Sequence, residues 1–302
     1  MENNIEIKNE VLQKDIDIKK EKKFSQWREM WYMIKQNKAA LVGMVIIVIL
    51  LLLAILGRII EPYDPNVGQL SESLQAPSTL HWFGTDEQGR DILSRIIDGT
   101  KISLRVGITA VAFALTIGIV MGSIAGYYGG KIDMIVMRVM DIILAFPSLL
   151  LAIAFMSALG RGIDKAIIAI SIVTIPEYAR IVRSSILSVK ESEYIQAARV
   201  IGNTDRAIIF KHILPNVISP IVVRATLGIS SAILDTAALG FLGLGVQPPT
   251  AEWGSMLGSG RGYFFNAPHI VVFPGIAITI TVLAFNLFGD GLRDALDPKL
   301  RN

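Results

Sequence analysis

Six long apolar segments divide this sequence, and each has about the length of a membrane-spanning helix. A helix needs roughly 20 apolar residues to cross the hydrocarbon core of a bilayer. The segments lie at residues 39–60, 104–128, 134–159, 165–187, 217–244 and 269–291. Charged residues make up only 18% of the chain, against about 25% in a typical soluble domain. The sequence therefore predicts an all-α membrane protein with six transmembrane helices.

Small residues and prolines indicate which segments contact other helices. Glycines at four-residue intervals form a stripe that permits close backbone contact between helices. Such a stripe begins in the second segment and consists of Gly118, Gly122, Gly126 and Gly130. The third, fourth and fifth segments contain Pro147, Pro176 and Pro220 together with charged residues. Such segments are expected to face protein or water rather than lipid.

The distribution of lysine and arginine predicts the orientation in the membrane. If the N-terminus lies inside, nineteen of the 29 basic residues fall on the cytosolic side and six fall in the outer loops. An excess of basic residues marks the cytoplasmic loops of membrane proteins. Both termini and the loop at 188–216 are therefore expected in the cytosol, and the loop at 61–103 outside it.

The two ends of the chain have simpler expected roles. Residues 1–23 are polar and rich in lysine, so we expect a disordered cytosolic tail without a cleavable signal peptide. The segment at 24–38 is expected to form an amphipathic helix in the headgroup region, with a cytosolic extension of the first span as the alternative. Its apolar residues follow helical spacing: Phe24, Trp27, Trp31 and Ile34. Residues 292–302 are expected to form a cytosolic tail.

The loop at 188–216 contains an unusual stretch, EYIQAARVIGNTDRAIIFKHILP, between two apolar segments. Four residues would share one apolar helical face: Tyr194, Ala197, Ala198 and Ile201. Its two adjacent alanines would leave a shallow surface that another protein can approach. Gly202 is expected to turn the chain, and Thr204 to cap a second helix from Asp205 to about His212. Pro215 is expected to end that helix.

This stretch resembles the cytoplasmic coupling loop of the permease subunits of ABC importers. The residues that match the family pattern are Ala197, Ala198, Gly202, Leu214 and Pro215. The pattern has glutamate where this chain has Gln196 and isoleucine where it has His212. Both departures are familiar in the peptide-importing branch. The resemblance implies that the loop docks on a cytosolic ATPase, with Glu193 and Tyr194 beside the matched residues.

The outer loop at 61–103 resembles the same family. Its stretch HWFGTDEQGRDILSRIIDGTKISL is similar to the segment before the transport domain in the C-type permease subunit of dipeptide, oligopeptide and nickel importers. The matching residues are Phe83, Gly84, Thr85, Asp86, Gly89, Arg90, Asp91, Ser94 and Arg95. The resemblance covers roughly residues 24–301. It implies a type I ABC-importer permease fold with a core permease domain at 104–291.

The sequence contains no recognisable catalytic or nucleotide-binding motif. The nearest approach to a phosphate-binding loop, AGYYGGKI at 125–132, has alanine in place of the first glycine and Ile132 in place of the Ser or Thr that holds magnesium. The chain has no cysteine, and its three histidines are far apart in the sequence. We therefore expect no enzyme activity, metal site or cofactor in this chain. ATP and magnesium would be bound by separate ATPase subunits.

Charged residues within the apolar segments are costly in hydrocarbon and mark buried or functional positions. Local ion pairs along one helix face are the simplest interpretation for two pairs that are three residues apart: Arg138 with Asp141, and Glu177 with Arg180. Arg224 and Asp235 lie on one face of the fifth segment but are too far apart to touch. They are expected to line the translocation pathway or to bind a partner subunit.

Together these features predict the transmembrane subunit of an ABC importer for di- or oligopeptides in the cell membrane of a prokaryote. The resemblance implies several partners: a second homologous permease subunit, two cytosolic ATPase subunits, an extracytoplasmic solute-binding protein, membrane lipid and peptide, but no nucleic acid. One alternative keeps this role with nickel, glutathione or another small solute as cargo. The other is a secondary transporter without ATPases, in which the pattern at 193–215 would be a coincidence.

Overall fold

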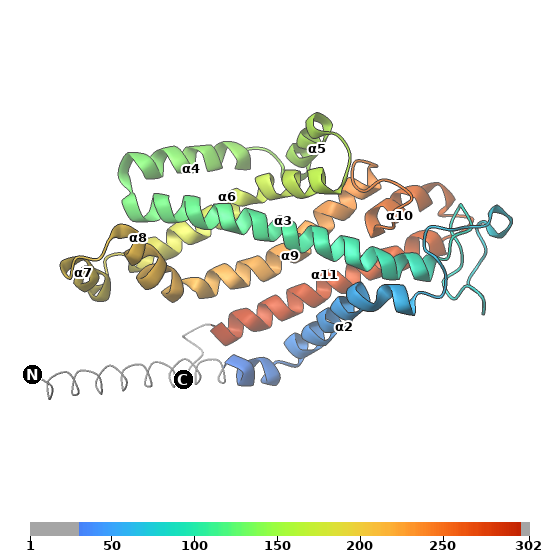
Figure 1. Ribbon diagram of the computed structural model, residues 1–302, viewed down its shortest axis with the longest axis horizontal. Coiled ribbons are helices and arrows are strands. Elements are labelled where there is room, and N and C mark those ends of the chain that lie inside the picture. The colour runs from blue at the N-terminus through green and yellow to red at the C-terminus, as the bar shows by residue number, and fades with distance from the viewer. Residues whose placement is uncertain (1–29, 297–302) are drawn as a thin grey trace, which may run out of the picture.

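Long helices lying side by side form the body of the molecule, as seen in a computed structural model of the chain (Figure 1). The structure describes residues 30–296, so the predicted tail at 1–23 and the last residues of the tail at 292–302 lie outside it. The helices are α2 (Lys38–Ile60), α3 (Ile92–Tyr128), α4 (Gly130–Leu144), α5 (Ser148–Leu159), α6 (Ile163–Val189), α7 (Glu193–Val200), α8 (Asp205–Ala207), α9 (Ile218–Phe241), α10 (Trp253–Gly260) and α11 (His269–Leu296).

Four of the described helices are long and apolar enough to cross a membrane: α2, α3, α9 and α11. α4 and α5 together could form a fifth crossing. α6 is 27 residues long and covers the predicted span at 165–187. It is less apolar than the others because it contains Glu177, Arg180 and Arg183.

The predicted span at 134–159 is not one continuous helix. α4 ends at Leu144, α5 begins at Ser148, and the two helices are inclined by 89°. Pro147 lies at the break. A proline has no backbone N–H for the helix ladder, and its ring disfavours the helical conformation of the residue before it. Hydropathy did not reveal the bend because the chain is apolar on both sides of it.

α3 begins at Ile92, well before the predicted start of the second span at residue 104. Asp91 caps the helix, since its carboxylate accepts a hydrogen bond from the backbone N–H of Ser94 at 2.8 Å. The added turns contain Arg95 and other polar residues, so hydropathy alone assigned them to the outer loop. That loop therefore ends at residue 91 and not at 103.

The glycine stripe brings α3 and α6 into close contact, as predicted. A Cβ atom at Gly118, Gly122 or Gly126 would crowd backbone or Cβ atoms of α6. Gly130 differs from the other three. It has a φ of +55° at the start of α4, and a side chain there would meet no neighbouring atom.

Ion pairs within the bundle join different helices. They are Arg180–Asp141 (2.5 Å) and Arg183–Asp133 (2.5 Å) between α6 and α4, and Arg224–Glu177 between α9 and α6. The predicted local pairs, Arg138–Asp141 and Glu177–Arg180, are therefore wrong. Asp141 and Glu177 each bind an arginine from a neighbouring helix, because an arginine side chain is long enough to reach across a helix contact.

The segment before α2 is helical from residue 30 to residue 36, and Asn37 then caps α2. Ile34 is buried against Val223 of α9 and Leu292 of α11, while Trp31 is exposed. The described part of the predicted amphipathic helix thus buries an apolar residue against the bundle.

Candidate functional site

The loop at 188–216 lies at one end of the molecule, where α7 and α8 extend beyond the long helices (Figure 1). α7 turns Ile195 and Ala198 inward, and both are buried with Ile208 of the same loop and Ile186 of α6. The loop is therefore a folded unit that is anchored to α6.

The predicted apolar face of α7 is only partly accessible. Tyr194, Ala197 and Ile201 are exposed, whereas Ala198 is 5% exposed and belongs to the buried side. Neighbouring residues of a helix point about 100° apart, so Ala197 and Ala198 face different surroundings. A large residue at Ala198 would disturb the packing of the loop itself.

Gly202 makes the turn after α7, as predicted. Its φ is +85°, a conformation that glycine adopts without steric cost, and its N–H donates to the carbonyl of Arg199 at 2.9 Å. Thr204 then caps α8 by accepting from the N–H of Ala207 at 3.4 Å. The predicted second helix continues past α8 as a π-helical turn at Ile208–Ile213 and a 3-10 turn at Leu214–Asn216.

Four apolar side chains project from the loop into open space. We call Tyr194, Val200, Ile201 and Phe210 the tip patch. Val200 and Ile201 are 87% and 80% exposed, so the fold of this chain does not bury them. Exposed apolar side chains at the end of a molecule are candidates for a contact with another protein. The sequence reasoning missed Val200 and Phe210, although Val200 follows Ala197 at helical spacing.

The remaining predicted loop residues support the shape of the loop. Glu193 is exposed in the first turn of α7, and Gln196 donates from Nε2 to the carbonyl of Glu191 at 3.0 Å. Leu214 is half-buried against the apolar cluster, and Pro215 is exposed in the 3-10 turn.

A direct contact links the loop to the end of α3. The hydroxyl of Tyr127 donates to Asp205 at 2.7 Å, and the guanidinium group of Arg199 lies 5.5 Å from the centre of the Tyr127 ring. A displacement of α7 and α8 would therefore act on α3 as well as on α6.

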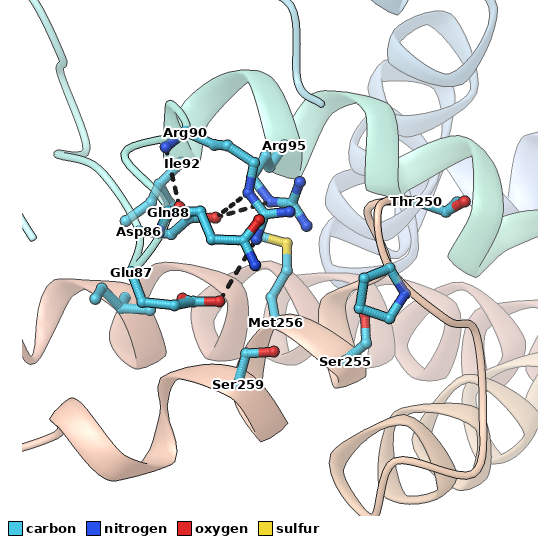
Figure 2. Close-up of a pocket in the computed structure, with 12 residues that line it drawn as sticks. Asp86, Glu87, Gln88, Arg90, Ile92, Arg95, Thr250, Ser255, Met256 and Ser259 are labelled. Atoms are coloured by element: carbon cyan, nitrogen blue, oxygen red, sulfur yellow. Dashed lines mark hydrogen bonds and ion pairs between the residues drawn. The ribbon is translucent and has the colours of Figure 1, made fainter. Parts of the chain in front are cut away.

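The segment at 83–95 forms a buried ionic cluster at the opposite end of the molecule. Asp86 accepts from Arg90 Nε at 2.6 Å and lies 3.4 Å from Arg95 Nε, and all three residues are buried. Glu87 contacts Arg90 at 3.5 Å. Figure 2 shows these side chains beside a pocket that α10 closes with Ser255, Met256 and Ser259.

Arg95 joins three parts of the chain. Its Nη1 donates to the carbonyl of Pro65 at 2.7 Å and to that of Pro249 at 3.4 Å. Asp91 caps α3 and also contacts His81 Nδ1 at 2.9 Å. The cluster therefore fastens the segment at 61–91 and the segment before α10 onto the start of α3.

The other residues of this segment shape tight turns. Gly84 and Gly89 have φ values of +77° and +72°, and side chains there would overlap the backbone at Gln75 and Gln69. Phe83 stacks on Phe273 of α11 with ring centres 4.1 Å apart. The two remaining residues of the pattern form hydrogen bonds. The hydroxyl of Thr85 accepts from the backbone N–H of Gln75, and the hydroxyl of Ser94 donates to Asp91.

Glu252 is a buried carboxylate beside this cluster. It caps α10 by accepting from the N–H groups of Gly254 and Ser255, each at 2.8 Å, and it is 1% exposed. Burial raises the pKa of Glu252 to about 7, although both hydrogen bonds act in the opposite direction.

This raised pKa predicts a pH dependence of stability. Between the ordinary value of 4.5 and about 7 the folded protein binds more protons at Glu252 than the unfolded chain does, so stability falls as the pH rises through that window. Glu252→Gln is expected to remove this slope, because the amide cannot ionise and still offers an acceptor. Melting temperatures of the purified protein from about pH 5 to pH 8 would test it. The exposed Glu193→Gln serves as the control, and parallel slopes in wild type and Glu252→Gln would contradict the assignment.

Arg224 and Asp235 are not brought together. Arg224 is half-buried and pairs with Glu177. Asp235 is also half-buried, and it forms no hydrogen bond or ion pair with any residue of the described range 30–296.

The described residues form a helical bundle with an anchored loop at one end, and the sequence comparisons identify the family. The profile of the family described as binding-protein-dependent transport system inner membrane component matches residues 118–302. A second profile, the N-terminal TM domain of oligopeptide transport permease C, matches residues 25–77. The chain belongs to this family of inner membrane components and is a multi-pass protein of the cell membrane.

Its relatives are permease proteins of similar length. The chain is 51% identical to the dipeptide transport system permease protein DppC of Alkalihalophilus pseudofirmus, over 92% of this chain and 91% of that protein. It is 45% identical to the glutathione transport system permease protein GsiD of Pectobacterium atrosepticum, over 91% and 92%. A solved structure of the inward-facing MetNI methionine ABC transporter contains a chain of similar fold, with a TM-score of 0.55 and 22% sequence identity. The match covers 67% of the present chain and 97% of the chain in that structure. That likeness supports the type I importer permease fold.

Proposed function

We propose that this chain is a permease subunit of an ABC importer for di- or oligopeptides. The observation that supports this most strongly is the 51% identity to a dipeptide permease over nearly the whole of both chains. Glutathione is the second candidate cargo, since the glutathione permeases are 45% and 46% identical. Glutathione is itself a short peptide, so both cargoes require a path that accepts a peptide backbone.

In the proposed arrangement the chain crosses the membrane six times. The crossings are α2, α3, the bent pair α4–α5, α6, α9 and α11. α2 begins and α11 ends at the same end of the molecule as α7 (Figure 1). Most of the basic residues would lie on that side, which supports its assignment as the cytosolic side.

The proposed importer contains further subunits. A second, homologous permease completes the path, two cytosolic ATPases bind ATP and magnesium, and an extracytoplasmic binding protein delivers the cargo. The tip patch would insert into a groove on one ATPase. Closure of the ATPase pair would then move α7 and α8, and the contacts with α6 and Tyr127 would pass that motion to the bundle.

Purification of the tagged chain from its native membrane in mild detergent would test this proposal. Two P-loop ATPases and a second permease are expected in the eluate, and the complex in proteoliposomes should take up a labelled dipeptide only with ATP inside the cytosolic compartment. An eluate that holds this chain alone, with uptake driven by a proton or sodium gradient, would favour the secondary transporter.

A further inference from the structure

One face of α9 is not covered by the other helices of this chain. The opposite face buries Ile233 and Ala237 against α3 and α10. On the uncovered face Ser231 and Leu234 are exposed, and Asp235 and Ala238 are half-buried. These positions follow three- and four-residue spacing, so they form one stripe along the helix.

This stripe is too polar to face lipid. A carboxylate in the hydrocarbon region is expensive unless it faces protein or water. α2 provides the contrast, because its exposed residues are apolar and include Ile55 and Ile59 at 76% and 82% exposure. The uncovered face of α9 therefore lines a water-accessible path or a contact with another subunit.

The stripe connects two hollows at the two ends of α9. The outer hollow is apolar and is lined by Leu149, Leu234, Ala238 and Phe241, among others. The inner hollow lies between α6, α9 and α11, and its lining includes Ser184, Ser219, Arg224 and Arg293. Asp235 is adjacent to Leu234 at the outer hollow, about 16 Å along the helix from Arg224 at about 1.5 Å per residue. A solute that passes along this face would meet Asp235 before Arg224.

Asp235 differs from three other acidic residues of the bundle, which have a basic partner. Asp133, Asp141 and Glu177 each hold an arginine of a neighbouring helix. Within residues 30–296 Asp235 holds no cation, and it is half-buried on the same helix face as Leu234 and Ala238. A half-buried carboxylate without a basic partner attracts an external cation, because it has already lost part of its hydration.

We propose that Asp235 is a substrate-contacting residue that binds the ammonium group of a peptide as it passes through the membrane. This inference rests on the proposed function, because a peptide with a free N-terminus supplies the cation. The carboxylate would replace part of the hydration that the ammonium group loses on entering the path. The alternative, a basic residue of the second permease as the partner of Asp235, is an outcome of the test.

Cysteine labelling tests whether Asp235 faces water. The chain has no cysteine, so Asp235→Cys introduces the single thiol of this chain, and the variant is labelled in the assembled complex. A cationic methanethiosulfonate reagent is expected to modify it about tenfold faster than the buried control Thr236→Cys, since only a hydrated thiolate reacts readily. Addition of dipeptide-loaded binding protein and ATP should slow the reaction. A rate equal to that of Thr236→Cys would overturn the proposal.

Uptake measurements test the charge. Asp235→Asn is expected to lower the initial rate of dipeptide uptake about tenfold, the loss of one charge-assisted contact, and Asp235→Glu should restore it. Unchanged uptake by Asp235→Asn would overturn the proposal. So would loss of the second permease from the Asp235→Asn complex, which would instead assign Asp235 to a subunit contact. If the wild-type complex takes up no dipeptide, the proposed function fails, whereas the labelling result still decides whether Asp235 faces water.

Discussion

Gly202→Trp is expected to abolish peptide uptake while the chain stays in the membrane. Gly202 has a φ of +85°, and a Cβ atom there would have no atom within 4 Å among residues 30–296, apart from its chain neighbours. The indole would therefore extend outward beside Val200 and Ile201, into the space that the proposed ATPase groove would occupy. We expect uptake to fall by about 100-fold or more, which corresponds to about 2.7 kcal/mol of lost docking energy. Uptake of labelled dipeptide into membrane vesicles, with an immunoblot for the chain, measures both effects.

A second substitution separates bulk from backbone strain. Any side chain at a positive φ costs about 1–2 kcal/mol, but asparagine tolerates this conformation better than other residues. Gly202→Asn should therefore retain most of the uptake and still bind the ATPases during purification. Normal uptake by Gly202→Trp would show that the loop at 188–216 does not dock on another subunit. Equal loss in both variants would attribute the effect to the turn itself.

Asp86→Ala is expected to destabilise the protein by about 3–5 kcal/mol, the usual cost of removing one partner from a buried ion pair. Asp86 binds the side chain and the backbone N–H of Arg90 and lies 3.4 Å from Arg95. Its removal would leave two buried guanidinium groups without their main counter-charge. The segment at 61–91 would then loosen from α3 and from the segment before α10. Thermal unfolding of the detergent-solubilised protein, followed by loss of the monodisperse species, measures the effect.

Glu87→Ala is the matched control for Asp86→Ala. Glu87 carries the same charge and adjoins Asp86, but its contact with Arg90 is longer, at 3.5 Å, and its side chain is less buried. We expect it to lower the melting temperature only slightly. A melting temperature of Asp86→Ala close to that of Glu87→Ala would mean that the ionic cluster adds little to the stability of the fold.

The two clusters of predicted site residues differ in how much the sequence could say about them. The residues at 83–95 were recognised as a pattern, but nothing in their spacing showed that Arg95 reaches Pro65 and Pro249. In the loop at 188–216 the turn at Gly202 and the cap at Thr204 were predicted in place. The inward direction of Ala198 was not, because it depends on how α7 packs against Tyr127 of α3, Ile186 of α6 and Ile221 of α9.

The sequence by itself determined the features that depend on neighbouring residues. These are the apolar segments, the turn at Gly202, and the small-residue stripe that lets α6 approach α3. Each follows from local hydropathy, backbone conformation or side-chain size. Only the tertiary structure decided the partners of the charges within the bundle and the uncovered face of α9 with Asp235. These depend on which distant side chains meet when the helices pack, and the spacing of residues along one helix carries no information about that.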